Sequence, residues 1–480
     1  MKVPRPLPAK PENFAIIACV ASESARHWTS SVANGDTEYK KTTGPSDLSH
    51  LNPSVSSLDS PILTGRVNRI ETLLPVVFFV SPLATSVAPR LTPFFVAAIG
   101  IILIGSALRR ERPWRDLLPP RPALAACVLF AAYVFLNATW SADPLAGVGK
   151  ASLLLGLILI TFASVEAASS LEKATLRRAA IAFAAGALFG ALFIMVELLT
   201  RGVVTRTVMA WMPYLSSPKH FKKLDGVLIA LKLSKLDQNA NLALFHLWPG
   251  LLALMALAST RRLAAMVLYF VAMAAVIVLS EHDSSQVALI ASSLVLILAW
   301  TWRTAVIRAL AVLWCVAFVF VLPLSFAAYD SGLHFANWLP NSARARVILW
   351  EFTAEQALKR PLLGIGVDST PRLRDQQQKS SARPEGFIYQ RTTGHHAHSI
   401  FLQSWYELGA VGVLLLAIAG AAVVLLIFFL PVSGQPFAAA VFAAFAIVGA
   451  FAWGMWQSWF LCATALLPLY LRVAAATAEK

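Results

Sequence analysis

Three histidines lie within four positions of "GHHAHSIFLQSWYELGAVG", a stretch that becomes apolar directly after them. His398 and Ser399 stand where a long helix would begin. The first N–H groups of a helix have no partner inside it and form the positive end of its dipole. A histidine there should have a lowered proton affinity, so its neutral ring could accept a proton from a hydroxyl. The pattern therefore predicts a general base at His398, while three merely interfacial polar histidines remain the alternative.

A metal site would be another use for clustered imidazoles. No carboxylate or thiol stands at ligand spacing beside His395, His396 and His398, and the sequence has no CxxC motif. Of the four cysteines, one lies in the polar N-terminal part and three lie inside apolar runs, so we expect no external disulfide. We expect neither a metal nor a cofactor.

Basic residues at two places could hold an anion beside such a base. Arg346 belongs to "NSARARVILWEFTAEQALKRPLLGIG", whose apolar spacing predicts an amphipathic helix with Trp350 one turn from Arg346. Guanidinium groups match phosphate oxygens. The segment 201–238 is also basic, and an anion site and an ordinary solvated or headgroup-binding surface explain it equally well. The candidate binding residues are His396, Ser399, Arg201, Arg206, Lys232, Lys235 and Trp350.

The elements that must position these residues belong to a membrane protein. The chain has 480 residues, of which 58% are hydrophobic and 14% charged. Lys and Arg outnumber Asp and Glu by 40 to 25, which favours loop charges and anionic lipid as the reason, and we expect no nucleic acid partner. Segments of about 20 apolar residues can cross a bilayer. We place them near 70–89, 91–108, 122–139, 147–168, 178–200, 239–258, 262–280, 284–301, 304–328, 400–430, 435–456 and 458–475.

These segments predict an all-α polytopic fold with about twelve transmembrane helices. An N-terminus on the inside puts most basic short loops on the cytoplasmic side. The two long loops, 201–238 and 329–399, then face outward, and the second is a large helical loop between helices 9 and 10. Residues 1–66 are rich in Ser, Thr, Pro and Asn and predict a disordered cytoplasmic tail. Residues 67–480 form the predicted membrane domain.

Two motifs in this order resemble the O-antigen ligase and O-antigen polymerase superfamily of bacterial envelope glycosyltransferases. "HSIFLQSWYELGAVG" is similar to the family signature of a His, an amide or hydroxyl residue, nine positions, Gly, two positions and Gly. "RVILWEFTAEQALKRPLLGIG" is similar to the family segment of an Arg, a Trp and a Pro-Leu-X-Gly-X-Gly turn. The matching positions are His398, Ser399, Gly409, Gly412, Arg346, Trp350, Pro361, Leu362, Gly364 and Gly366.

The resemblance implies a metal-independent transfer of a glycan from undecaprenyl pyrophosphate to an acceptor hydroxyl. It places a multi-pass protein in the bacterial inner membrane, with its active site facing the periplasm. It assigns His398 to activating the acceptor and Arg346 to holding the pyrophosphate. The implied partners are the lipid-linked glycan, an acceptor glycan or glycolipid, membrane lipid and, in some relatives, a chain-length regulator. Ligase and polymerase activity, for O-antigen or exopolysaccharide, both stay open.

The chain departs from the family pattern where relatives often carry arginines. Gln238 or Asn239 stands at the start of the sixth span, and Gln286 stands at the start of the eighth. Lys232, Lys235, Arg201 or Arg206 must then supply the charge, unless this member is catalytically altered. Val413 and Leu414 replace two threonines of the ligase signature, which weakens assignment to a strict lipid A-core ligase.

Other classes of function stay open from the sequence. About twelve spans is also a common layout for transporters, so a polytopic transporter or flippase of envelope precursors is the main alternative. The spans contain almost no acidic residues and no visible internal repeat, which is unlike most transporters. An inactive scaffold is a third possibility.

Overall fold

The structure is a computed structural model that describes residues 69–118, 121–211, 221–224, 227–232, 235–257, 260–374 and 391–477. All of them belong to the compact unit Gly65–Lys480. The tail predicted for residues 1–66 lies outside the described residues.

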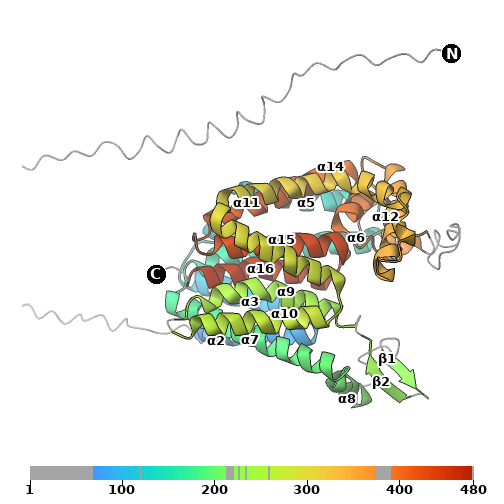
Figure 1. Cartoon of the computed structure of the whole chain (residues 1–480). Helices are drawn as coiled ribbons and strands as arrows, with labels where there is room; N and C mark the ends of the chain where they lie inside the picture. The colour runs from blue at the N-terminus through green and yellow to red at the C-terminus, as the bar shows by residue number, and fades with distance from the viewer. Residues whose placement is uncertain are drawn as a thin grey trace, which may run out of the picture. The chain divides into compact units, whose positions relative to one another are not determined.

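The first part of the described chain is helical (Figure 1). It forms α2 (Arg69–Val87), the short 3-10 helix η1 (Pro89–Leu91), α3 (Thr92–Arg109), α4 (Trp114–Leu117), α5 (Pro122–Ala138), α6 (Pro144–Ala168) and α7 (Lys173–Leu199). The start of α6 shows how the sequence sets a boundary, because Pro144 occupies the first helical position and the Asp143 carboxylate accepts the Ala146 N–H at 3.0 Å.

The remaining elements include one pair of strands, which the sequence analysis did not predict. They are α8 (Val203–Trp211), β1 (Phe221–Leu224), β2 (Val227–Leu231), α9 (Asp237–Leu254), α10 (Arg262–Leu279), α11 (Asp283–Asp330), η5 (Leu333–Phe335), α12 (Asn341–Leu358), α14 (Ile400–Leu425), η6 (Leu426–Phe429), α15 (Gln435–Phe451) and α16 (Ser458–Ala475). β1 and β2 pair in antiparallel fashion within the first long loop.

Each of the twelve predicted segments contains a helix, with α11 covering two of them. The α11 backbone leaves the helical region at Trp302, between the predicted eighth and ninth spans. Seven of the described helices are long and apolar enough to cross a membrane, namely α3 together with η1, α6, α7, α10, α11, α14 and α16. α2, α5 and α15 are apolar but shorter. The helices support a mainly helical multi-pass membrane protein with one small hairpin, and the number of twelve spans stays a prediction.

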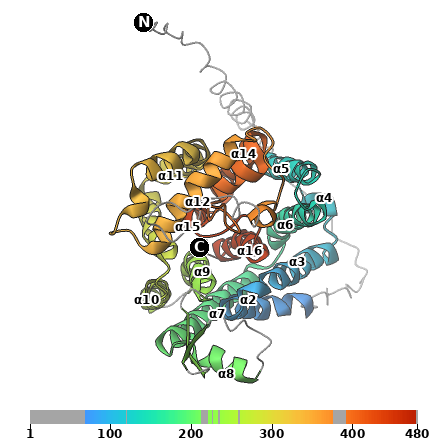
Figure 2. The same cartoon turned by 90° about the vertical axis from the view of Figure 1, so that its right-hand side faces the viewer.

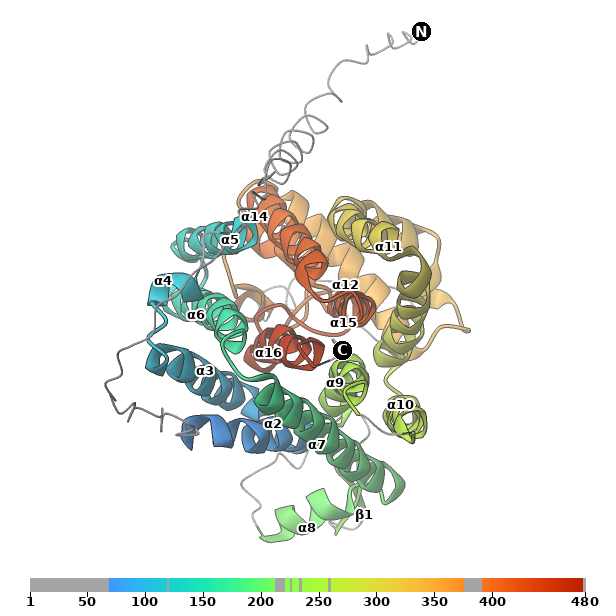
Figure 3. The same ribbon diagram turned by 90° about the vertical axis from the view of Figure 1, so that its left-hand side faces the viewer.

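The helices bring both long loops to one end of the bundle. Figure 1 shows α8, the β1–β2 hairpin and α12 at the same end. Figure 2 looks onto this end, with α12 near the middle and α8 at the edge. Figure 3 gives the opposite view, in which α16 and α9 lie inside the ring of helices; α16 packs against α3, α6, α7 and α9. We continue to predict that the end carrying α12 faces outward.

α14 is broken at Gly409, where we had expected an unbroken helix over 400–430. Gly409 has φ +65°, and the turn that follows α12 fits into the break. The Ala410 N–H donates to the Pro361 carbonyl at 2.8 Å, and the Gly366 N–H donates to the Glu407 carbonyl at 3.0 Å. Backbone groups that the broken helix cannot pair are thereby satisfied, as an apolar environment requires.

The glycines of the two motifs are needed at this junction. Gly364 and Gly366 also have positive φ, which side chains rarely adopt. A Cβ on Gly409 would lie 2.5 Å from the Leu362 carbonyl, and one on Gly364 would lie 2.3 Å from the Glu407 carbonyl oxygen. The two sequence motifs are therefore parts of one packed unit that fixes α14 against the end of α12.

Candidate active site

His398 lies in a sharp turn directly before α14. Its φ is +53°, an uncommon conformation for a residue with a side chain. Ser399 follows as the N-cap of α14, and its hydroxyl accepts the Leu402 N–H at 3.4 Å. The predicted place of both residues at the start of this helix is correct. Ser399 is buried and its hydroxyl caps the helix, and its predicted role in substrate binding stays a prediction.

The partner of His398 fixes which ring nitrogen carries the proton. His398 Nδ1 lies 2.7 Å from the Ala452 carbonyl oxygen. A carbonyl only accepts, so Nδ1 donates and Nε2 of the neutral ring has a free lone pair. Burial lowers the pKa of His398, and the charge of Arg346 lowers it further, against the raising effect of the Ala452 bond. The lowered proton affinity agrees with our prediction, although burial and Arg346 now account for it where we had invoked the helix dipole.

His396 packs directly against His398. The centroids of the two rings are 4.1 Å apart. The Gln457 amide nitrogen donates to His396 Nε2 at 3.2 Å. Burial lowers the pKa of His396 to about 3, with smaller contributions from His398 and His395, so the ring is neutral. His396 is suited to support His398 as a neutral neighbour, whereas His395 is exposed and bonded to Arg374.

Arg346 interacts electrostatically with carboxylates that the sequence analysis had not included in the site. Burial lowers its pKa, and Asp283 and Asp237 oppose that shift. Burial also raises the pKa of Asp237, the first residue of α9, to about 7, with Arg346 acting in the opposite direction. His282, which precedes α11, is coupled to the same groups and to His398. Arg346, His398 and these partners therefore form one electrostatic cluster drawn from four segments.

Trp350 anchors the histidine segment. Its indole N–H donates to the Ala397 carbonyl at 2.9 Å. The same segment is tied down at its start, where the Arg391 guanidinium pairs with Glu351 at 2.6 Å and with Glu355 at 3.1 Å. We had predicted a substrate-binding role for Trp350, and the structure favours a positioning role because its polar group already has a protein partner.

The loop 452–457 between α15 and α16 contacts three histidines of the site, His282, His396 and His398. Besides the Ala452 carbonyl and the Gln457 amide, Trp453 stacks on His282 with centroids 6.2 Å apart. Gly454 leaves room for His396, since a Cβ there would lie 2.6 Å from the His396 Cβ. We had placed residues 435–456 in a span, but α15 ends at Phe451. The cluster of tryptophans in "AWGMWQSW" is the one sequence signal that could have marked this loop as interfacial.

The basic residues of the first long loop lie in different places and have different surroundings. Arg206, within α8, donates to the Thr200 and Gly202 carbonyls at 3.3 and 3.4 Å, and Arg201 precedes this helix. Figures 1 and 2 both show α8 away from α12. Lys232 follows β2 and is exposed. Lys235 stands just before α9, and partial burial together with the nearby charge of Arg90 lowers its pKa.

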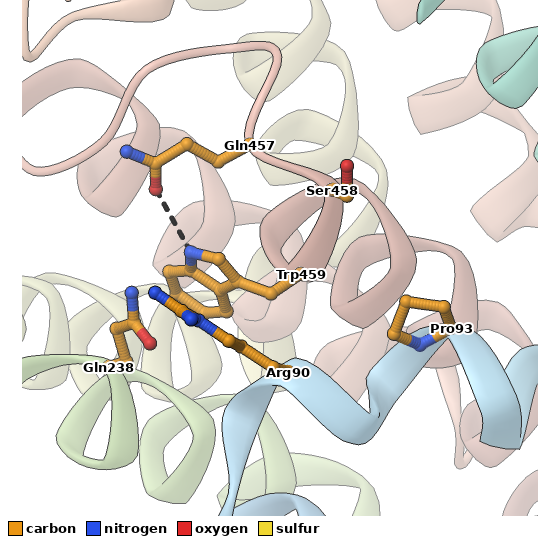
Figure 4. A pocket seen from close by; sticks show the side chains of 6 residues that line it. All are labelled: Arg90, Pro93, Gln238, Gln457, Ser458 and Trp459. Carbon is orange, nitrogen blue, oxygen red and sulfur yellow. Dashed lines mark hydrogen bonds between the residues drawn. The ribbon is translucent and has the colours of Figure 1, made fainter. Parts of the chain in front are cut away.

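A cavity of about 430 Å³ adjoins the histidines (Figure 4). It is lined by Arg90, Pro93, Gln238, Gln457, Ser458 and Trp459. The Gln457 side chain joins the cavity to the site, since its oxygen accepts the Trp459 indole N–H at 2.9 Å and its nitrogen bonds to His396. Arg90, in η1, is a candidate that the sequence analysis missed. Gln238, where the resemblance suggested an arginine, lies in the same cavity.

Within the described part of the chain, no group of three or more His, Cys, Asp or Glu side chains is arranged to hold a metal ion. The described cysteines Cys127, Cys315 and Cys462 are free thiols. The groups that the structure brings together offer proton transfer at His398 and anion binding by the Arg346 guanidinium.

Comparison with known proteins finds a family match for the part of the chain that carries Arg346 and His398. No curated protein matches the chain. Residues 268–417, which run from α10 into α14 and include Arg346 and His398, match the family model described as O-antigen ligase. This match confirms the resemblance to the O-antigen ligase superfamily that the two motifs indicated.

Proposed function

We propose that the protein transfers a glycan from undecaprenyl pyrophosphate to an acceptor hydroxyl at the periplasmic face of a bacterial inner membrane. The family match supports glycan transfer of the ligase or polymerase type. The observation that carries the finer proposal is the fixed tautomer of His398, whose Nε2 can take a proton while Nδ1 is held by the Ala452 carbonyl.

The protein's own side chains can supply both the base and the cation that the proposed step needs. The acceptor oxygen attacks the anomeric carbon of the donor sugar, and its proton passes to His398 Nε2. The bond between that carbon and the pyrophosphate oxygen breaks, and undecaprenyl pyrophosphate leaves with the electron pair. A fixed cation such as Arg346 would stabilise the charge that develops on the leaving group. Pyrophosphate is a good leaving group once its charge is balanced, so the proposal needs no metal or cofactor.

The surroundings of His398 support this role. A base with a lowered pKa is unprotonated at neutral pH, and His396 adds no charge beside it. The Ala452 carbonyl holds the imidazole itself, while Trp350 and Ser399 fix the backbone on either side of His398, which limits the freedom a catalytic group would otherwise lose on reaction.

Reconstitution of the purified protein tests the proposal. Proteoliposomes would receive a glycan on undecaprenyl pyrophosphate together with a hydroxyl-bearing acceptor. We expect glycosylated acceptor and free undecaprenyl pyrophosphate in equal amounts, with the same yield after chelation of divalent metals. Movement of the donor across the bilayer with no transfer to the acceptor would instead support a flippase and overturn the proposal.

A further inference from the structure

Glu407 is a fully buried carboxylate inside α14, and the sequence analysis gave it no role. Acidic side chains within membrane spans are costly, so they find partners and usually serve a function. The Glu407 carboxylate accepts five hydrogen bonds from three segments, namely the turn 366–370, α14 itself and the loop 452–457. The donors are the Asp368 N–H at 3.1 Å, the Thr370 N–H at 3.1 Å, the Gln403 amide at 3.2 Å, the Thr370 hydroxyl and the Trp456 indole N–H.

The Gln403 side chain, one turn before Glu407, is oriented by a partner of its own. Its oxygen accepts the Met455 N–H at 3.1 Å, so its nitrogen is the atom that faces Glu407. Two neighbouring side chains of α14 therefore hold consecutive residues of the loop 452–457, Gln403 through the Met455 backbone and Glu407 through the Trp456 indole. An amide in place of the Glu407 carboxylate would turn an NH2 group toward N–H donors, which cannot accept a hydrogen bond.

The loop that these side chains hold also orients the two buried histidines of the second long loop. The Ala452 carbonyl oxygen lies 2.7 Å from His398 Nδ1, and the Gln457 amide lies 3.2 Å from His396 Nε2. Residues 455 and 456 lie between these two contacts in the chain. His398 itself stands directly before α14. The ring of His398 and the carbonyl that orients it are thus both positioned from the first turns of the same helix.

We propose that Glu407 is a positioning residue for the transfer reaction, which holds the loop 452–457 so that the Ala452 carbonyl keeps the proton of His398 on Nδ1. The inference rests on the proposed function, because that tautomer matters to the reaction only where Nε2 accepts the proton of the acceptor hydroxyl. Without this support the loop moves, and the neutral ring of His398 carries its proton on either nitrogen. A ring that is protonated on Nε2 cannot act as the base.

Nitrogen NMR of the full-length protein in lipid, with isotope-labelled histidine, reads the tautomer without any substrate. Signals that are missing from His398→Ala identify His398. In the wild type we expect a protonated Nδ1 and an unprotonated Nε2, and in Glu407→Gln a mixture of both tautomers. A folded Glu407→Gln protein with the wild-type signals of His398 would overturn the inference.

Two milder variants separate positioning from stability and do not depend on whether Glu407→Gln folds. Trp456→Phe removes the indole donor on the side of the loop, whereas Thr370→Val removes the hydroxyl donor on the side of the turn. Lys150 still donates to the Trp456 carbonyl at 2.9 Å, so the loop stays attached in Trp456→Phe. Each variant loses one bond to the same buried carboxylate, so a merely structural role predicts equal losses of transfer.

We expect Trp456→Phe to lower kcat by about 10-fold and Thr370→Val by less than about threefold, with the KM for the donor unchanged in both. Equal falls of kcat in the two variants, in proportion to their loss of thermal stability, would overturn the inference. The NMR result does not depend on glycan transfer. Wild-type protein with a fixed His398 tautomer that Glu407→Gln abolishes, yet with no transfer, would overturn the proposed function and leave the positioning of the ring by Glu407 standing.

Discussion

The two long loops at one end of the bundle differ in how their charge relates to the site. The first, 201–238, has the higher density of basic residues, yet α8 and its hairpin lie at the edge of the molecule (Figure 2). The second, 329–399, has its described parts bound to the helices at several points. Arg391 pairs with Glu351, and the Trp350 indole donates to the Ala397 carbonyl. The turn of residues 361–366 supplies backbone partners at the break in α14.

In this protein, therefore, the number of basic residues in a loop does not indicate where the site lies. The second loop gains its candidate role because the Ala452 carbonyl, the Gln457 amide and packed rings fix its histidines. From the first loop, Lys235 lies near Arg90, whose charge contributes to lowering its pKa. Substitutions that loosen the packing of the second loop, or that remove basic side chains from the first, test this contrast.

Filling the break in α14 should have the largest effect. Gly364→Ala introduces a Cβ that would lie 2.3 Å from the Glu407 carbonyl oxygen, at a φ of +68°. Strain and overpacking together should cost on the order of 3 kcal/mol, and transfer should be lost because the second loop no longer holds His398 in place. Thermal unfolding in detergent measures the first effect and reconstituted transfer the second. Gly149→Ala is the control, since a Cβ there meets nothing within 4 Å.

Removing the charge of Arg346 should both slow transfer and move its pH dependence. The loss of a charged contact to the leaving group predicts a decrease of about 10-fold to 100-fold for Arg346→Ala. Arg346 lowers the pKa of His398, so its removal raises that pKa. A base is inactive below its pKa, and the acidic fall of kcat/KM should therefore shift to higher pH. A fall at the same pH as in the wild type would contradict the coupling of these two residues.

Trp350→Phe should give a smaller effect, because it keeps the ring and removes only the hydrogen bond to the Ala397 carbonyl. That bond contributes about 1 kcal/mol, so we expect transfer to fall by roughly fivefold. Trp405→Phe removes a comparable bond, from the indole to the Phe318 carbonyl at 2.7 Å within the helical bundle. If both variants lost transfer equally, the bond of Trp350 would have no special role in positioning the histidines.

Charge removal from the edge of the first loop should have the smallest effect. Arg201 is exposed and Arg206 is half-buried; both belong to the segment of α8, away from α12, and charges near the surface contribute little energy at such a distance. The double variant Arg201→Gln with Arg206→Gln should keep transfer within about threefold of the wild type. A loss as large as that of Arg346→Ala would restore the first loop as the main anion site.

The sequence predicted the features that depend on local pattern. Apolar length located the helices, and the change from polar to apolar residues located His398 at the start of α14. The break at Gly409 was missed because its backbone partners come from residues 361–366, far away in the sequence. Asp237, Arg90 and the loop 452–457 were missed for the same reason, since nothing near them in the chain shows that folding brings them to the histidines.

The most direct test of the central claim is the rate of glycan transfer by His398→Ala compared with His395→Ala in the same proteoliposomes. Loss of a general base should slow transfer by about 100-fold or more in His398→Ala, while the protein still inserts and unfolds as the wild type does. His395 is exposed and lies outside the cluster, so His395→Ala should keep the wild-type rate. A His398→Ala protein that transfers glycan as fast as His395→Ala would contradict the account.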